Sequence, residues 1–256
     1  MLVYTFDRTL DGVLSAVFDA YFRRQQADML IGNGDQLPLF CDEVWQVTTT
    51  EEKASRVWAG LEKKLAPEAL KLITVSWQSE DATLSTPLFH YIYKVFRHGD
   101  IARNFADPDV LFVTNTARRV MHEQLRMKQF IRFQKAKDGT YLGVVAPDTD
   151  VLPLVTGHFQ DRFNDQPWLI YDARRHYGFY HDGNTVTRIT FDDETQITFS
   201  LSNGRLDDDV LSENDKLLQD LWRTYFKAIC IKERINPRKQ LNDMPRRYWR
   251  YMTEKQ

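Results

Sequence analysis

The sequence predicts an α+β fold in which an antiparallel sheet of about five to seven strands packs with a helical half and a C-terminal helix. Two observations support this fold class. The period of the apolar residues changes from helical to alternating near residue 129, and Asp-Gly or Asn-Gly turns separate the short segments that follow. The 256 residues contain no repeat and no long linker, so we expect one domain, with a helical half at about 50–127, a sheet-rich half at about 128–201 and a helical C-terminal segment at about 212–256.

The first elements follow from local periodicity. Leu2, Tyr4 and Phe6 alternate as in a strand, and a stripe of apolar residues from Leu10 to Tyr21 then recurs at helical spacing. The Gly32-Asn33-Gly34 segment predicts a loop, and residues 43–47 predict another short strand.

Start signals mark the helices of the helical half. Thr49 with Glu52 three residues later is a capping box, which predicts a helix behind it. Pro67, Pro87 and Pro108 each occupy a position suited to the first turn of a helix, where proline lacks only an N–H group that would be unpaired anyway.

The sheet-rich half is predicted from short alternating segments and turns. Asp138-Gly139 predicts a hairpin between strands around Ile131–Phe133 and Tyr141–Val145, and residues 150–163 predict a helix. Because the strands are close together, we expect antiparallel pairing. Further strands are predicted at Trp168–Asp172, Tyr177–His181, Thr185–Phe191 and Thr195–Leu201, and Ser212 is predicted to start a last long helix that ends before Pro237.

Composition bounds the class of protein. The formal net charge is −2, and the two cysteines, Cys41 and Cys230, form no Cys-x-x-Cys pair, which fits a reducing compartment. The N-terminus has no signal-peptide pattern, and no apolar stretch approaches the ~20 residues that span a bilayer. We therefore expect a cytoplasmic protein without membrane contact.

Charge is unevenly distributed along the chain. Residues 118–137 carry a local charge of +6, residues 223–250 carry +7 and residues 192–220 carry −7. Basic blocks attract polyanions, and the tail at 246–251 mixes arginine with tyrosine and tryptophan, which stack on bases. The alternative is that the blocks are solvated faces that neutralise one another. The candidate nucleic-acid contacts in the basic blocks are Arg118, Arg119, Lys128, Arg132, Arg246, Arg247, Trp249 and Arg250.

The sequence lacks the motifs of several enzyme classes. It contains no dinucleotide fingerprint, P-loop, nucleophile elbow, zinc-protease motif or deaminase motif, and two cysteines are too few for a three-cysteine iron–sulfur site. No His, Asp or Glu spacing indicates a metal, so we expect neither a metal nor a cofactor.

The densest polar constellation lies between residues 158 and 176. His158 and Arg162 are four residues apart on one face of the predicted helix. We expect the strand that begins at Trp168 to bring Asp172 beside them. His158 and Asp172 are therefore candidate catalytic residues, with Arg162 holding a phosphate. The alternative is structural, with His158 in an ordinary hydrogen bond and Arg162 paired with a nearby aspartate.

Several motifs together resemble the bacterial family labelled probable DNA metabolism protein. The resemblance runs over nearly the whole chain and is carried by Val3-Tyr4-Thr5-Phe6-Asp7 with Asp11-Gly12, His158-Phe159-x-x-Arg162-Phe163, Trp168-x-Ile170-x-Asp172-x-x-Arg175, and Met244-Pro245-Arg246-Arg247-Tyr248-Trp249-Arg250-Tyr251-Met252. Members of that family are encoded beside a radical-SAM protein, and some are fused to a uracil-DNA-glycosylase-like domain. The family itself has no established activity.

The resemblance implies a role in DNA repair or modification, with DNA and the neighbouring radical-SAM enzyme as partners. Because this chain carries no recognisable glycosylase site, we expect radical chemistry or base excision to belong to a partner. The resemblance favours His158, Arg162, Asp172 and Arg175 in the middle of the chain and Arg246, Arg247 and Trp249 near its end. Arg162, Arg174 and Arg175 are further candidate nucleic-acid contacts. Three hypotheses follow: a DNA-binding accessory protein, an enzyme that uses His158 and Asp172, and a protein-interaction module without DNA contact.

Overall fold

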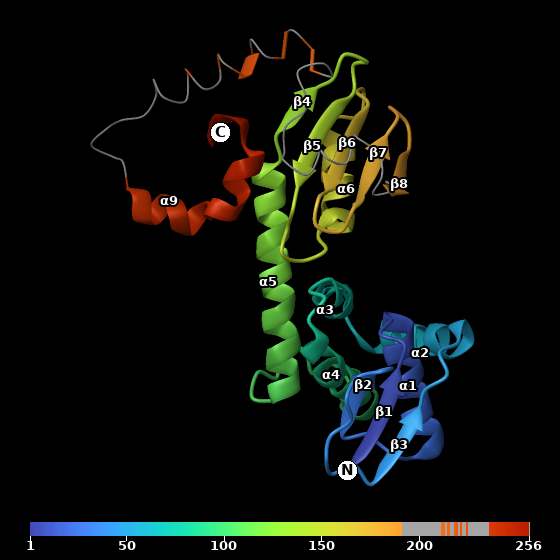
Figure 1. Ribbon diagram of the computed structural model, residues 1–256. Coiled ribbons are helices and arrows are strands. Elements are labelled where there is room, and N and C mark those ends of the chain that lie inside the picture. The colour runs from blue at the N-terminus through green and yellow to red at the C-terminus, as the bar shows by residue number, and fades with distance from the viewer. Residues whose placement is uncertain are drawn as a thin grey trace. The chain divides into compact units, whose positions relative to one another are not determined.

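The computed structural model describes residues 1–190, 211–212, 214–215, 218–219, 221, 224 and 236–255. The chain divides into two compact units, Met1–Met121 and His122–Gln256. Each unit has a β-sheet of its own with helices packed against it (Figure 1).

The first unit contains a three-stranded sheet in the order β2-β1-β3, formed by β1 (Leu2–Phe6), β2 (Met29–Gly32) and β3 (Glu43–Gln46). Both neighbours run parallel to β1. Helix α1 (Leu10–Arg23) returns the chain to the start of the sheet before β2, and the segment 33–42 does so before β3. The strands predicted around Leu2–Phe6 and at residues 43–47 are confirmed as β1 and β3. Strand β2 was not predicted, since it has four residues and ends in the glycine-rich loop.

Five further helical segments complete the first unit: α2 (Glu51–Lys64), α3 (Pro67–Trp77), the 3₁₀ turn η1 (Ala82–Leu84), α4 (Ser85–His98) and the beginning of α5 (Pro108–Phe130). Pro67 and Pro108 start their helices as predicted. The cap of α2 is Thr50, whose hydroxyl accepts the amide hydrogen of Lys53 at 3.3 Å, one residue later than predicted. Helix α4 begins two residues before Pro87 because η1 leads directly into it.

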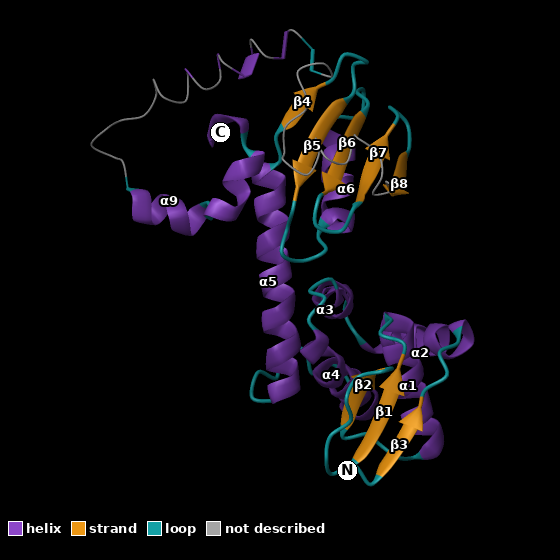
Figure 2. Cartoon of the chain, in the orientation of Figure 1, coloured by secondary structure: helices purple, strands orange, loops and turns teal. Residues whose placement is uncertain are grey.

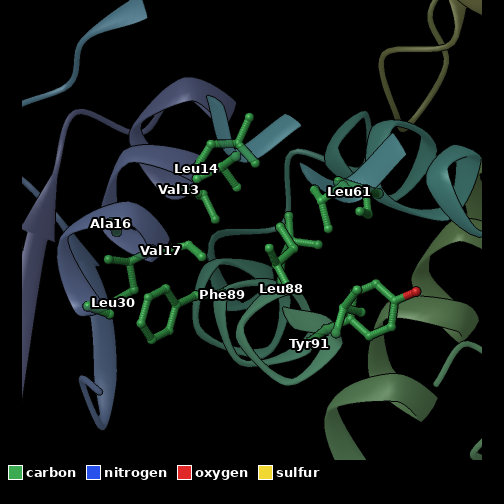
Figure 3. Close-up of a cluster of buried hydrophobic side chains, with 14 of the residues drawn as sticks. Val13, Leu14, Ala16, Val17, Leu30, Leu61, Leu88, Phe89 and Tyr91 are labelled. Carbon is green, nitrogen blue, oxygen red and sulfur yellow. The ribbon is translucent and has the colours of Figure 1, made fainter. Parts of the chain in front are cut away.

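The core of the first unit lies between α1, α2 and α4. Leu61, Leu88 and Phe89 are fully buried, and they meet Leu14 and Val17 of α1, as Figure 3 shows. The helical stripes of the sequence therefore face one another, and burial of this apolar surface supplies the main stabilisation of the unit.

The second unit contains a five-stranded sheet in the order β4-β5-β6-β7-β8. Its strands are β4 (Phe133–Lys135), β5 (Tyr141–Val145), β6 (Trp168–Asp172), β7 (Tyr177–His181) and β8 (Val186–Thr190). The hairpin at Asp138-Gly139 is confirmed: β4 and β5 are antiparallel, and Gly139 has a φ of +93°, which favours glycine.

The prediction of a purely antiparallel sheet is wrong, because β5 and β6 are parallel. The physical reason is the helix between them, α6 (Leu152–Arg162), which is long enough to carry the chain back so that β6 starts at the same edge as β5. The remaining pairs of neighbours are antiparallel, so the sheet is mixed (Figure 2). The α+β class is confirmed.

The C-terminal part of the chain is helical. It contains α9 (Pro237–Asp243) and the 3₁₀ segments η3 (Arg246–Tyr251) and η4 (Thr253–Lys255). The predicted strand at 195–201, most of the predicted helix after Ser212 and Cys230 lie outside the described residues. Within the described part, no helix combines the length and apolar character needed to cross a bilayer.

Candidate nucleic-acid interface

Arginines and carboxylates gather at the carboxyl ends of β5 and β6. Since the two strands are parallel, their carboxyl ends share one edge of the sheet, which is where α/β folds commonly place polar side chains from adjoining loops. We call this set the arginine cluster; its members are Glu123, Asp148, Asp172, Arg174, Arg175 and Arg247.

Asp172, the last residue of β6, anchors the inner side of the arginine cluster. Its fully buried carboxylate accepts hydrogen bonds from the amides of Arg174 at 2.8 Å and Arg175 at 3.2 Å and from Arg175 Nη1 at 2.8 Å. Burial raises the pKa of Asp172, and these hydrogen bonds offset the rise only in part. Arg175 also donates to the carbonyls of Pro147 and Asp148, so it ties the end of β6 to the loop after β5.

Glu123 of α5 anchors the second side of the cluster. Its buried carboxylate accepts hydrogen bonds from Arg247 Nη2 at 2.9 Å, from the Tyr248 hydroxyl and from the Asp148 amide at 3.1 Å. Burial, followed by the bond to Glu123, raises the pKa of Tyr248 well above its ordinary value, so this hydroxyl remains a donor. Glu123 thereby fixes η3 against α5.

Asp148 joins the two sides of the cluster. Its Oδ2 lies 3.0 Å from Arg247 Nη1 and its Oδ1 lies 3.6 Å from Arg174 Nη1. The side chains of Arg174, Asp148 and Arg247 are 56%, 53% and 39% exposed, whereas that of Arg175 is 11% exposed. The outer part of the cluster is therefore open to a ligand, and the inner part supports it.

The η3 segment extends this surface. A 3₁₀-helix repeats every three residues, so Tyr248 and Tyr251 share one face, and both are buried. Arg246 and Arg250 are exposed on the other faces. Trp249 is half-buried, with the Arg246 guanidinium 5.9 Å and the Lys255 ammonium 5.1 Å from its ring centroid. The structure thus places a tryptophan among cations at the chain end.

The structure brings together seven of the residues predicted from the sequence. Asp172, Arg174, Arg175 and Arg247 belong to the arginine cluster, and Arg246, Trp249 and Arg250 lie on η3, which carries Arg247. These residues come from two motifs more than 70 positions apart.

The described contacts of His158 and Asp172 do not join the two residues. The described contacts of the Asp172 carboxylate are with Arg174 and Arg175, while His158 lies near the end of α6 with its ring against Phe159. Helix α6 ends shortly before β6 begins, whereas Asp172 is where β6 ends. Arg162, exposed at the end of α6, lies beside Phe163. An acid/base pair of His158 and Asp172 stays a prediction.

Arg118 and Arg119 lie in the first unit. Arg119 Nη2 is 3.3 Å from Asp81 Oδ2, and the Arg118 guanidinium lies 5.8 Å from the ring centroid of Phe105. The charge of Arg119 is therefore partly compensated by Asp81.

Lys128 and Arg132 lie in the second unit. Arg132 forms a bidentate pair with Glu254, with Nη2 at 2.7 Å and Nε at 3.1 Å from Oε1. Lys128 is half-buried on α5. Two arginines of the basic block at 118–137 are thus paired with distant carboxylates, Asp81 and Glu254, and neither carboxylate belongs to the acidic block at 192–220.

Two members of the arginine cluster were missed by sequence reasoning: Glu123 and Asp148. Glu123 is the one acid in the basic block at 118–137, and it lies three residues after Val120 and four before Met127, both buried. An acid at a position of the buried stripe requires a partner, and this signal points to Glu123. Most of the acidic block at 192–220 lies outside the described residues.

No trio of His, Cys, Asp or Glu side chains in the described ranges is arranged to hold a metal ion.

A family model described as a domain of unknown function, DUF4130, matches residues 83–254, which is more than half of the chain. No curated protein matches the chain significantly. No solved structure does so either. The chain belongs to the DUF4130 family.

Proposed function

We propose that the protein is a DNA-associated accessory protein whose second unit binds a nucleic-acid backbone. Two lines of reasoning support the proposal: the resemblance of the sequence motifs to a DNA-metabolism family, and the chemistry of the surface formed by η3 and the arginine cluster. The resemblance also supports a radical-SAM enzyme as partner, which would carry out the chemistry while this chain presents the DNA.

The observation that carries the proposal is the arrangement of exposed guanidinium groups around Asp148 and on η3. Arg174 and Arg247 are held by the same carboxylate, and Arg246 and Arg250 are exposed on the same short segment as Arg247. Arginine binds phosphate through parallel N–H groups, and a guanidinium that is already held in place loses less entropy on binding. Trp249 adds a ring for stacking on a base.

The test is a fluorescence-anisotropy titration of single-stranded, duplex and uracil-containing DNA at several salt concentrations. The informative variant is R246Q/R250Q, because both side chains are exposed and neither is part of the buried Glu123 network. The matched control is R56Q/R103Q, which removes two exposed arginines from the first unit.

We expect steeply salt-dependent binding by the wild-type protein, since each phosphate contact releases counterions. The R246Q/R250Q protein should bind more weakly and show a slope of log K against log salt that is smaller by about 1 per lost contact. The control should keep the wild-type slope. Equal losses in both variants, or no binding of any DNA at low salt, would contradict the proposal.

A further inference from the structure

A small aromatic pocket lies in the second unit, apart from the arginine cluster. It has a volume of about 140 Å³ and is lined by Phe133, Tyr141, Phe163, Gln166 and Trp168. Four of these five residues are aromatic, and none of them belongs to the arginine cluster. Phe163 and Trp168 belong to the motifs between His158 and Arg175, and the proposed function gives these two residues no role.

The sheet register explains why three of these rings meet. Phe133 of β4 is opposite Gly143 of β5, and Tyr141, two residues before Gly143, points to the same face. Tyr141 is in turn in register with Trp168 of β6. Phe163, which follows α6 directly, closes the pocket with its ring 5.5 Å from that of Phe133.

One residue of the pocket wall, Trp168, has a buried hydrogen-bond donor without a partner. Trp168 is 1% exposed, and its buried Nε1–H has no acceptor among the described residues. The ring is held in place by His181, which stacks on it at 5.2 Å and whose Nδ1 is bonded to the Gln166 carbonyl. A buried N–H group without a partner is costly, so native proteins rarely keep one.

The size of the pocket selects one ring. A cavity of about 150 Å³ accommodates a benzene-sized molecule, so the present pocket matches a single six-membered ring better than a fused pair of rings. Aromatic walls favour a planar ring, and the Gln166 amide offers both a donor and an acceptor to polar groups on that ring. A pyrimidine base has these features.

Two cations lie beside the aromatic walls. Lys135 Nζ is 5.2 Å from the Tyr141 ring centroid, and the Arg162 guanidinium is 5.6 Å from that of Phe163. Proteins that bind single-stranded nucleic acid combine stacking rings with cations that follow the backbone. Aromatic walls, a polar glutamine and flanking cations therefore occur together.

We propose that this pocket binds one unstacked pyrimidine base of a DNA strand, with the Gln166 amide as hydrogen-bond partner of the base. The nucleic-acid setting rests on the proposed function, whereas the recognition of the ring does not require a backbone. The pocket would select thymine or uracil over purines by size.

The first experiment uses the free nucleoside thymidine, without a phosphate backbone. The protein has six tryptophans, and the indole N–H signal of Trp168 in a ¹⁵N-correlated NMR spectrum is identified as the one absent from the W168F spectrum. We expect thymidine to move this signal and deoxyadenosine to leave it in place. W45F, which removes an exposed tryptophan from the first unit, is the matched control and should leave the thymidine response unchanged.

Gln166→Ala provides a second variant in case W168F does not fold. The Gln166 carbonyl that His181 contacts is a backbone atom, so it remains in this variant. We expect the affinity for thymidine to fall by about fivefold, as when one good base contact is removed. An unmoved Trp168 signal with thymidine, or an equal shift with deoxyadenosine, would overturn the inference.

The second experiment separates the inference from the proposed function. Anisotropy compares a fifteen-nucleotide oligothymidine strand with the same strand lacking its bases at alternate positions. Weaker binding of the abasic strand, with the difference removed by Q166A, is the expected result. Salt-dependent binding with equal affinity for the intact and the abasic strand, together with no response to thymidine, would overturn the inference and leave the proposed function standing. A thymidine response without binding of any oligonucleotide would overturn the proposed function and leave the recognition of the pyrimidine ring standing.

Discussion

At the residue scale, the second unit depends on a long-range contact between Glu123 and Arg247. Their sequence separation is 124 residues, and the carboxylate is almost fully buried while the guanidinium is 39% exposed. A buried charge is tolerated only when it is paired and hydrogen-bonded, so Arg247 serves the fold as well as any ligand.

We therefore predict that Arg247→Ala lowers the free energy of unfolding by about 2 kcal/mol, since it removes a hydrogen bond to a buried charge. Arg246→Ala, the neighbouring exposed arginine, should change it by less than about 0.5 kcal/mol. Urea unfolding followed by circular dichroism measures both values. Equal stabilities of the two variants would show that the Glu123 pair carries no net energy.

A second residue-scale prediction concerns His90 in the first unit. His90 lies near Asp109 at 3.6 Å and contacts the Ala27 carbonyl at 3.0 Å, and hydrogen bonding to Asp109 raises its pKa above the ordinary value of 6.5. Lys94, which also contacts Asp109, opposes this rise. A group whose folded-state pKa is raised adds stability below its unfolded-state pKa and loses it as the pH rises through the folded-state pKa.

The stability difference between the wild-type protein and His90→Gln should therefore be greatest below pH 6.5 and should shrink as the pH rises above that value. Urea unfolding at a series of pH values measures it. In the Asp109→Asn background the pH dependence should be much smaller, because the main cause of the raised pKa is gone. A difference that grows with rising pH would refute the assignment.

At the scale of elements, two helical glycines show that local propensity and packing can oppose each other. A Cβ atom at Gly12 of α1 would lie 2.3 Å from Asp7 Oδ1 and 3.2 Å from Thr49 Oγ1, whereas one at Gly157 of α6 would have nothing within 4 Å. Asp7 Oδ1 cannot move freely, because it accepts hydrogen bonds from the Thr9 hydroxyl at 2.6 Å and the Thr9 amide at 3.1 Å.

We predict opposite signs for the two alanine substitutions. Gly157→Ala should raise the free energy of unfolding by about 0.5–1 kcal/mol, since glycine is a poor helix former. Gly12→Ala should lower it by about 1–3 kcal/mol, because the new methyl group overpacks a fixed carboxylate. Thermal and urea unfolding of the two variants measure the effects, and a stabilised Gly12→Ala protein would show that Asp7 yields at little cost.

At the scale of the whole molecule, each compact unit contains a cluster of buried apolar side chains among its described residues. The core of the first unit is built from residues of the first 113 positions, while a cluster in the second unit joins Leu142, Val144 and Tyr171 to Tyr251 of η3. Cooperative units of this kind open with their own free energies.

We expect Gly12→Ala to speed amide hydrogen exchange in β1 and α1 while exchange in β5 and β6 stays at its wild-type rate. Hydrogen exchange read by mass spectrometry tests this expectation, and Arg247→Ala supplies the reciprocal case, with faster exchange confined to the second unit. Equal acceleration in both sheets would mean that the units unfold together.

The sequence by itself determined the elements with strong local signals. The stripe from Leu10 to Tyr21, the prolines at 67 and 108 and the Asp138-Gly139 turn each act through neighbours a few residues away, so periodicity and backbone chemistry suffice to predict them. The arginine-rich tail was also visible in the sequence, because three arginines among four aromatic or sulfur-containing residues at 246–252 are unusual in any core.

Only the tertiary structure decided the pairing of the strands and the partners of the charged residues. A crossover helix made β5 and β6 parallel, and this placed Asp172 at the same edge as the loop that carries Asp148. Glu123 and Arg247 met because two distant segments pack together. Such contacts depend on chain topology, and local sequence patterns describe which faces are apolar without stating which faces will meet.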